Sequence, residues 1–165
     1  MDKTTYEPGN RIRFMVPGKP QGKARARTFP NYRTGKMQSI TPEKTVLYEN
    51  FIKQCCMEEM LKANHNGFFN KEAVQMQITA YFEIPKSASK KDKYLMYDGT
   101  LYPTKKPDAD NIAKAVCDAL NGILYKDDTQ VCALTVFKAY TPINERLQEK
   151  MKPCVIVTCQ TADYI

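Results

Sequence analysis

Four segments of the chain carry the apolar pattern of β-strands. Apolar and polar residues alternate in part over residues 11–16 and at the start of residues 74–82, which become more uniformly apolar toward their end. Because successive side chains of a strand point to opposite faces, such alternation is typical of a strand that buries one face. Residues 131–140 and 154–161 have the composition of two further strands, joined by residues 141–153. The sequence therefore predicts four strands.

Helical spacing predicts a long helix between the first two strands. Its apolar stripe consists of Leu47, Tyr48, Phe51, Ile52 and Cys55. Thr41 precedes this stripe as the expected N-cap, followed by Pro42 at the first helical position and by Glu43 in the first turn. We expect this helix to run to about Asn64, where an Asn-His-Asn-Gly stretch ends it.

A second helix is predicted over residues 110–121, with Gly122 as its natural end. Apolar residues recur there at intervals of four, three and four, so they share the face that packs inward. These inward residues are Ile112, Val116, Ala119 and Ile123. A short helix is also expected within residues 86–98.

The resulting order of elements is typical of the α+β class. We expect one compact domain over residues 1–165, with a small mixed sheet of about four strands packed with two or three helices. Residues 1–10 are polar and are expected to be flexible. They lack the apolar stretch of a secretion signal, and no run approaches the ~18 apolar residues that span a bilayer. We therefore expect no membrane contact.

Composition narrows the chemistry that is available to the protein. The chain has 165 residues, of which 42% are apolar, with six cysteines and one histidine. The cysteines form no C-x-x-C pair, so we expect free thiols in a reducing cytosol and no disulfide or zinc site. The single histidine, His65, makes histidine triads and multi-histidine metal sites poor candidates. Any catalysis must rest on carboxylates, lysines or hydroxyls.

The formal net charge of +7 is unevenly distributed. Between Pro8 and Pro42 the sequence has eight basic residues and no acidic residue, which leaves −1 for the remainder. The Gly- and Pro-rich residues 17–27 are expected to form an exposed loop, whose cations suit a phosphate backbone. The alternative is a basic surface that serves only solubility.

An acidic cluster follows a second basic stretch that ends at Lys105-Lys106. Five aspartates and two lysines lie within residues 108–128. The helix face opposite the apolar one carries Asp110, Lys114 and Asp118. Asp108, in extended chain just before the helix, can point to the same side. Carboxylate oxygens presented together are the ligands that a hard cation such as Mg²⁺ prefers.

Each acidic feature also has a purely structural explanation. Asp110 is a candidate N-cap, and Asp108 is a carboxylate able to stabilise the helix dipole. Asp110 and Lys114 have the spacing of an ordinary ion pair on a helix. Asp127 and Asp128 are typical turn residues ahead of a strand. The combination is harder to explain in this way, because a cap needs one carboxylate and the sequence supplies two before the helix and two after it.

At these residues the sequence resembles the RusA family of Holliday-junction resolvases, especially its phage- and prophage-borne members. The resemblance rests on a D-x-D-N-x-x-K motif at residues 108–114 and on D-D-x-Q-V at residues 127–131, with Asp-Ala-Leu-Asn-Gly at residues 118–122 between them. Weaker similarity occurs at residues 16–20, 23–27 and 40–42. The resemblance thus covers most of residues 11–157.

The resemblance implies a homodimeric endonuclease that nicks a four-way DNA junction symmetrically in recombination and repair. It implies Mg²⁺ as the cofactor, with Mn²⁺ as a substitute, no small-molecule cofactor, and action at the nucleoid in a bacterial cytoplasm. Asp108, Asp110 and Asp128 would be the catalytic carboxylates that bind the metal. Lys114 would be the essential lysine, and Asp127 would be an assisting residue. The predicted DNA-binding residues are Lys19, Lys23, Arg25, Arg27, Lys105 and Lys106.

Two other functions remain open on the sequence. One is a non-catalytic nucleic-acid-binding module whose aspartates only cap a helix, and the other is a related metal nuclease that acts on flaps or RNA. Phe29, Tyr32 and Tyr94 lie among basic residues, where aromatic rings are able to stack on unpaired bases. We expect ordinary packing for these three side chains, because aromatic residues mostly serve cores.

Overall fold

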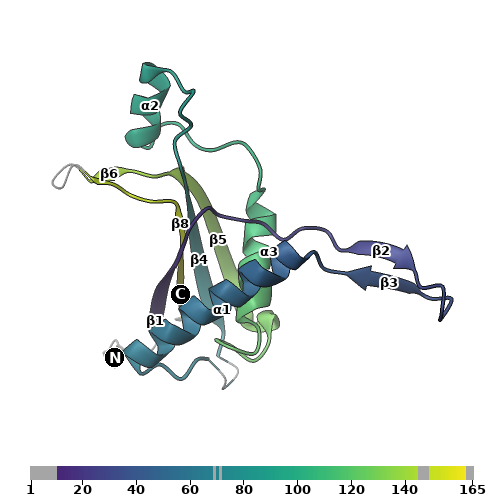
Figure 1. Ribbon diagram of the computed structural model, residues 1–165. Coiled ribbons are helices and arrows are strands. Elements are labelled where there is room, and N and C mark those ends of the chain that lie inside the picture. Colours follow the sequence, from purple (N-terminus) through teal and green to yellow (C-terminus); the bar gives the residue numbers. More distant parts are fainter. Residues whose placement is uncertain (1–10, 69, 71, 145–148, 163–165) are drawn as a thin grey trace, which may run out of the picture.

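A four-stranded mixed β-sheet forms the centre of the molecule (Figure 1). The computed structural model describes residues 11–68, 70, 72–144 and 149–162, so the flexibility expected for residues 1–10 lies outside the described residues. The strands are β1 (Arg11–Pro17), β4 (Val74–Phe82), β5 (Val131–Tyr140) and β8 (Cys154–Thr161), in the spatial order β1-β8-β4-β5. Strand β8 is antiparallel to β1 and β4, whereas β4 and β5 are parallel. The predicted α+β class and mixed sheet are confirmed.

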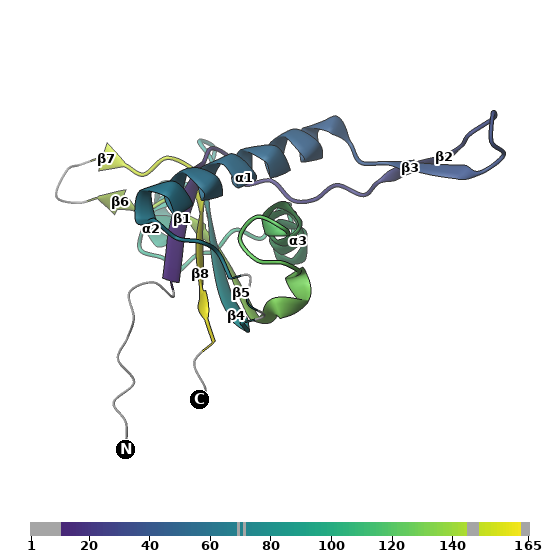
Figure 2. The ribbon, with the colours of Figure 1, turned by 90° about the horizontal axis from the view of Figure 1, so that it is seen from below.

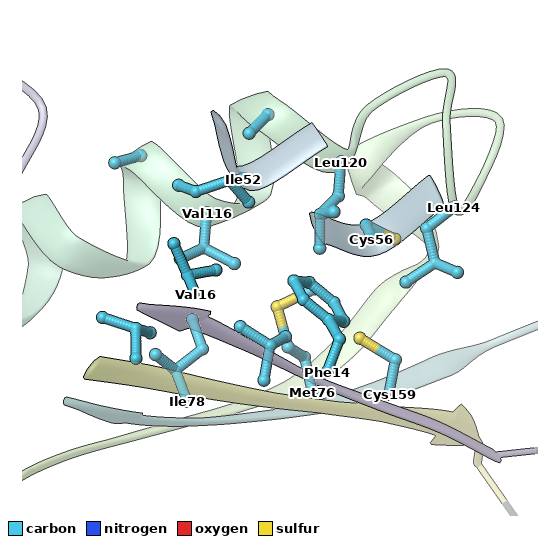
Figure 3. Packing of buried hydrophobic residues seen from close by; sticks show 14 of the residues in the cluster. Phe14, Val16, Ile52, Cys56, Met76, Ile78, Val116, Leu120, Leu124 and Cys159 are labelled. Atoms are coloured by element: carbon cyan, nitrogen blue, oxygen red, sulfur yellow. The ribbon is translucent and has the colours of Figure 1, made fainter. Parts of the chain in front are cut away.

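Two helices cover one face of this sheet. They are α1 (Glu43–Ala63) and α3 (Ala109–Leu120). The strand register places Val157 beside both Phe14 and Ile78, so apolar side chains from three strands meet in one row. Ile52 of α1 and Val116 of α3 face this row, and all five side chains are buried (Figure 3). Each such side chain stabilises the fold by roughly 1.5–3 kcal/mol, and together they fix α3 against the sheet.

Helix α1 begins two residues later than its expected cap. Its N-cap is Pro42 and not Thr41, because the Pro42 carbonyl accepts the first helical hydrogen bonds, from Thr45 at 2.9 Å and Val46 at 3.2 Å. The C-terminal end agrees with the prediction, since Asn64 adopts the left-handed conformation that closes a helix, with φ of 50°.

The inward face of α3 was predicted correctly except at its last position. Ile112, Val116 and Ala119 are buried, but Ile123 is only half-buried because the helix has already ended at Leu120. The turn that follows buries other side chains in its place, Leu124 and Tyr125. The Tyr125 hydroxyl donates a hydrogen bond of 3.0 Å to the Cys117 carbonyl, and burial raises the pKa of Tyr125 well above its ordinary value.

The basic segment contains a hairpin that the sequence did not predict. Strand β2 (Arg27–Pro30) pairs with β3 (Met37–Ile40) in an antiparallel hairpin, residues 27–40, which we call the arm. The arm projects beyond the N-terminal end of α1, away from the sheet (Figures 1 and 2). Every residue of its two strands is exposed. A two-stranded hairpin without buried side chains has little stability of its own.

The remaining elements are short. They are α2 (Lys90–Tyr97), η2 (Asp128–Gln130), β6 (Ile143–Asn144) and β7 (Glu149–Lys150), of which α2 had been predicted. All six cysteines are free thiols, as expected. None of the helices formed by the described residues combines the length and apolar character needed to cross a membrane.

Candidate active site

The first two predicted carboxylates lie at the start of α3. Asp108 is the N-cap residue, with extended backbone angles, and Asp110 lies in the first helical turn. Lys114 follows one turn later, and all three side chains are exposed. Among the described residues, the side chain of Asp108 has one hydrogen bond, a long one of 3.5 Å that its Oδ2 accepts from Asn111 Nδ2. The helix therefore presents two carboxylates and an ammonium to solvent while its opposite face is held in the core.

Two of the three structural explanations for these residues are wrong, whereas the position of both carboxylates at the N-terminal end of α3 agrees with stabilisation of the helix dipole. Asp108 and not Asp110 occupies the N-cap, and its side chain makes no capping hydrogen bond. Asp110 and Lys114 form no ion pair, because the ion pairs between described residues join Lys23 to Glu49 and Asp118, and Lys62 to Glu59. Among the described residues, therefore, neither carboxylate at the start of α3 forms an ion pair or a capping hydrogen bond.

Asp127 and Asp128 differ in their hydrogen bonding, because the side chain of Asp127 caps η2 and that of Asp128 does not. Asp127 is the N-cap of η2, and its Oδ1 accepts a hydrogen bond of 3.0 Å from the backbone N–H of Thr129. Hydrogen bonds from Thr129 hold the pKa of Asp127 below its ordinary value. Asp128 is exposed and carries no such capping duty. The turn therefore uses Asp127 structurally and leaves the carboxylate of Asp128 available.

The side chain of Gln130 fastens this turn to a distant segment. Its Nε2 donates to the carbonyls of Phe68 at 2.8 Å and Glu72 at 3.0 Å. Its Oε1 accepts from the backbone N–H groups of Lys126 at 2.9 Å and Asp127 at 3.2 Å. All the hydrogen-bonding groups of the amide are thus engaged, so Gln130 fixes the position of the turn that carries Asp128. The sequence motif contains Gln130, but nothing in it indicates these contacts.

A second connection joins the base of the arm to α3. Residues 21–26, which we call the root loop, pass so close to α3 that a Cβ on Gly22 would lie 2.9 Å from the Cβ atoms of Asn111 and Pro107. The backbone N–H of Lys23 donates to the Asn111 carbonyl at 2.8 Å. Glycine is needed here because only hydrogen fits between the loop and the start of the helix. The root loop therefore abuts the segment that bears Asp108 and Asp110.

The ammonium of Lys23 lies between α1 and α3. It donates a hydrogen bond to Asp118 of α3 and lies 3.0 Å from Glu49 Oε1 of α1, an ion pair without hydrogen-bond geometry. Desolvation alone lowers the pKa of Lys23, but the contacts with Asp118 and Glu49 outweigh it, so its pKa lies above the ordinary 10.5. Lys23 thus ties the root loop to both helices.

The donor chemistry of the site fits a hard divalent cation, although its ligands are not gathered in advance. Asp108, Asp110 and Asp128 offer exposed carboxylate oxygens, which are the ligands of Mg²⁺. Within the described residues, however, no three His, Cys, Asp or Glu side chains lie close enough together to hold a metal ion. The structure places Asp108 and Asp110 together at the start of α3 and Asp128 in the turn after it.

Comparison with known proteins identifies the family of this chain. The profile of the family described as Endodeoxyribonuclease RusA matches residues 17–148. The chain belongs to the RusA family. "Uncharacterized protein YqaN" from Bacillus subtilis (strain 168) is 36% identical over 132 residues, which cover 79% of this chain and 88% of that protein. Membership of the RusA family supports a junction-resolving endonuclease, which is a hydrolase that acts on branched DNA.

The DNA-binding residues predicted for this RusA-family chain fall in three places. Lys19, Arg25 and Arg27 are exposed before and at the start of the arm. Lys105 and Lys106 are exposed just ahead of Asp108, where Lys138 Nζ donates to the Lys105 carbonyl at 2.7 Å. The ammonium of Lys23 is already engaged with two carboxylates, as described above. DNA contact by any of these residues remains a prediction.

The expectation of ordinary packing for three aromatic residues is wrong. Phe29 is 42% exposed, Tyr32 95% and Tyr94 69%. Phe29 and Tyr32 belong to the arm and Tyr94 to α2, and both elements project from the sheet, so the core cannot cover these rings (Figure 1). The arm of this RusA-family member therefore presents aromatic rings together with cations.

Proposed function

We propose that this protein is a Mg²⁺-dependent endonuclease that resolves four-way DNA junctions by paired nicks during recombination and repair in a bacterial cytoplasm. The observation that carries the proposal is the exposed pair of Asp108 and Asp110 at the start of α3, without a cation partner among the described residues. Lys105 and Lys106 adjoin this pair and supply the positive charge that a phosphate backbone needs. Membership of the RusA family supports the same conclusion.

The residues would divide the work by their charge. Asp108, Asp110 and Asp128 would hold the cation, which supplies polarisation of a phosphoryl oxygen and a lowered pKa of bound water. Lys114 is a compact cation one turn along α3, so it is suited to stabilising negative charge that develops on the phosphate or on its leaving group. The basic residues before α3 would position the backbone, and selectivity for a junction would come from DNA shape.

Two nicks on opposed strands require two active sites, so the proposal includes a homodimer. Strand β5 lies at an edge of the sheet and exposes Leu134 (45%) on one face and Phe137 (52%) on the opposite face. An edge strand with exposed apolar side chains is a surface that a second copy is able to cover. Phe137→Glu is expected to shift sedimentation toward the monomer and to uncouple the two nicks. Unchanged sedimentation at micromolar concentration would exclude this surface.

The deciding experiment compares cleavage of a labelled four-way junction with linear duplex, flap and RNA substrates. We expect Mg²⁺- or Mn²⁺-dependent cleavage of the junction alone. Asp110→Asn should abolish cleavage while junction binding stays intact or tightens, because one negative charge is removed. Full activity of Asp110→Asn would sink the site assignment, and preferred cleavage of flap or RNA would redirect the substrate.

A non-catalytic DNA-binding module is the second candidate. It is favoured by one observation, that the described residues contain no ready three-ligand metal group. This candidate predicts tight junction binding with no cleavage of any of the four substrates in either metal. Junction cleavage that is lost with Asp110→Asn would exclude it.

A further inference from the structure

One face of the arm is hollowed. Across the two strands Arg27 pairs with Ile40 and Phe29 pairs with Gln38, so these four side chains lie on the same face of the hairpin. A hollow of about 390 Å³ opens on this face, where the arm meets the start of α1. It is lined by Arg27, Phe29, Ile40, Thr41, Pro42 and Glu43.

The hollow combines apolar walls with the guanidinium of Arg27, which pairs with no carboxylate among the described residues. Phe29 (42%) and Ile40 (46%) are both widely exposed, which leaves apolar surface that a ligand would cover favourably. Arg27 is exposed and belongs to none of the ion pairs between described residues. A nucleotide matches this pairing, because its base has an apolar face for stacking and its phosphate accepts hydrogen bonds from a guanidinium.

We propose that this hollow binds one unstacked nucleotide of the DNA substrate, with its base stacked on Phe29 and an adjacent phosphate on Arg27. The inference rests on the proposed function for the substrate and deepens it, because the continuous base stacking of an intact duplex is interrupted at a branch point. Charge favours DNA over an apolar peptide, since residues 8–42 contain eight basic residues and no acidic residue. The one carboxylate at the hollow, Glu43, is an acceptor for the amino groups that bases present.

Tyr32 is the natural internal control for this assignment. It lies in the turn of the same arm, is 95% exposed and does not line the hollow. A base stacked on Tyr32 would gain one ring and no second wall, whereas a base beside Phe29 also covers Ile40 and Pro42. Stacking is therefore assigned to Phe29, and Tyr32→Ala should change little.

The test measures binding in EDTA, where no metal-dependent cleavage occurs. Fluorescence anisotropy follows a four-way junction, an oligo-dT strand, an oligo-U strand and an intact duplex. Phe29→Ala should weaken junction and oligo-dT binding on the order of tenfold and leave duplex binding unchanged. Phe29→Trp should restore affinity, whereas Phe29→Leu, which fills the hollow without an aromatic face, should not. Arg27→Ala should lower the slope of log K against log salt by about one, and Phe29→Ala should leave the slope unchanged.

Several results would overturn the proposal. One is that Phe29→Ala or Phe29→Leu binds junction and oligo-dT with wild-type affinity, and another is that the affinity for duplex falls equally. The others are that Tyr32→Ala weakens binding in place of Phe29→Ala, and that the protein prefers oligo-U to oligo-dT. Circular dichroism verifies that each variant keeps its fold. Cleavage of the same junction by the unmodified protein in Mg²⁺ tests the proposed function separately. An unmodified protein that does not cleave, combined with a Phe29→Ala variant that loses oligo-dT binding, would remove the nuclease and leave the nucleotide site standing.

Discussion

The arm and the carboxylate residues around α3 differ in how firmly the rest of the molecule holds them. Every residue of β2 and β3 is exposed, so the arm contributes nothing to the core. Helix α3 buries six of its twelve residues, and the turn that follows it is held by the four hydrogen bonds of Gln130. Metal-dependent hydrolysis needs ligands that are held within about 0.5 Å, whereas a strand of DNA can order the element that grips it. The rigid region is therefore the one for which chemistry is proposed, although the described residues do not gather its three carboxylates around one metal position.

The largest expected effect is a difference in cleavage rate between variants of two adjacent carboxylates, Asp127 and Asp128. Asp128→Asn should lower Mg²⁺-dependent junction cleavage on the order of 100-fold or more, because one of the three proposed metal ligands is lost. Asp127→Asn should retain most activity, since an asparagine side chain is still able to cap η2 through its carbonyl oxygen. Single-turnover cleavage rates of both variants measure the contrast. Equal losses would mean that the turn does not divide metal binding from capping.

The next largest effect is expected from removing the side-chain hydrogen bonds of Gln130, which hold that turn in place. Gln130→Ala should lower the free energy of unfolding by about 2 kcal/mol, because it leaves the carbonyls of Phe68 and Glu72 without their donor. Cleavage should fall with it, and raised Mg²⁺ should recover part of the loss. Gln77→Ala, at an exposed glutamine of β4, is the matched control and should leave both quantities unchanged. Urea unfolding and the Mg²⁺ dependence of cleavage provide the measurements; a Gln130→Ala protein with unchanged stability would show that the fastening is unimportant.

The sequence predicts whatever depends on a local pattern and misses what depends on distant partners. The inward face of α3 follows from helical spacing, and the carboxylates follow from a compact motif. The contacts of Gln130 join residues 62 and 58 positions apart, and Lys23 meets Asp118 across 95 positions, so no short pattern carries them. The arm was missed for a different reason. A hairpin that buries nothing leaves no apolar alternation in the sequence.

A smaller effect should appear where the two regions meet. Lys23→Gln removes the cation between Asp118 and Glu49 and should lower the free energy of unfolding by about 1 kcal/mol, since the pair is only partly buried. Lys36→Gln, an exposed lysine of the arm, should change it by less than about 0.5 kcal/mol.

The stabilisation that Lys23 provides should depend on pH. Because the folded-state pKa of Lys23 lies above the ordinary 10.5, its stabilising contribution is fully present below pH 10.5 and is lost as pH rises through the folded-state value. The difference in stability between the unmodified protein and Lys23→Gln should therefore shrink in alkaline solution. A difference that persists there would assign the effect to packing of the lysine stem.

The smallest effect is expected for Ile40→Ala in the arm, and the same substitution at Ile112 of α3 serves as its reference. Ile40→Ala truncates a side chain of the arm that is 46% exposed and contacts no core, so the free energy of unfolding should change by less than about 0.5 kcal/mol. Ile112→Ala truncates a fully buried side chain of α3 and should cost about 2–5 kcal/mol, because it leaves a cavity against the sheet. Urea unfolding of the two variants and of the unmodified protein measures both changes in the free energy of unfolding. A cost above about 1 kcal/mol for Ile40→Ala would mean that the arm packs against the body in solution, and the hollow beside Phe29 would then be closed to a nucleotide.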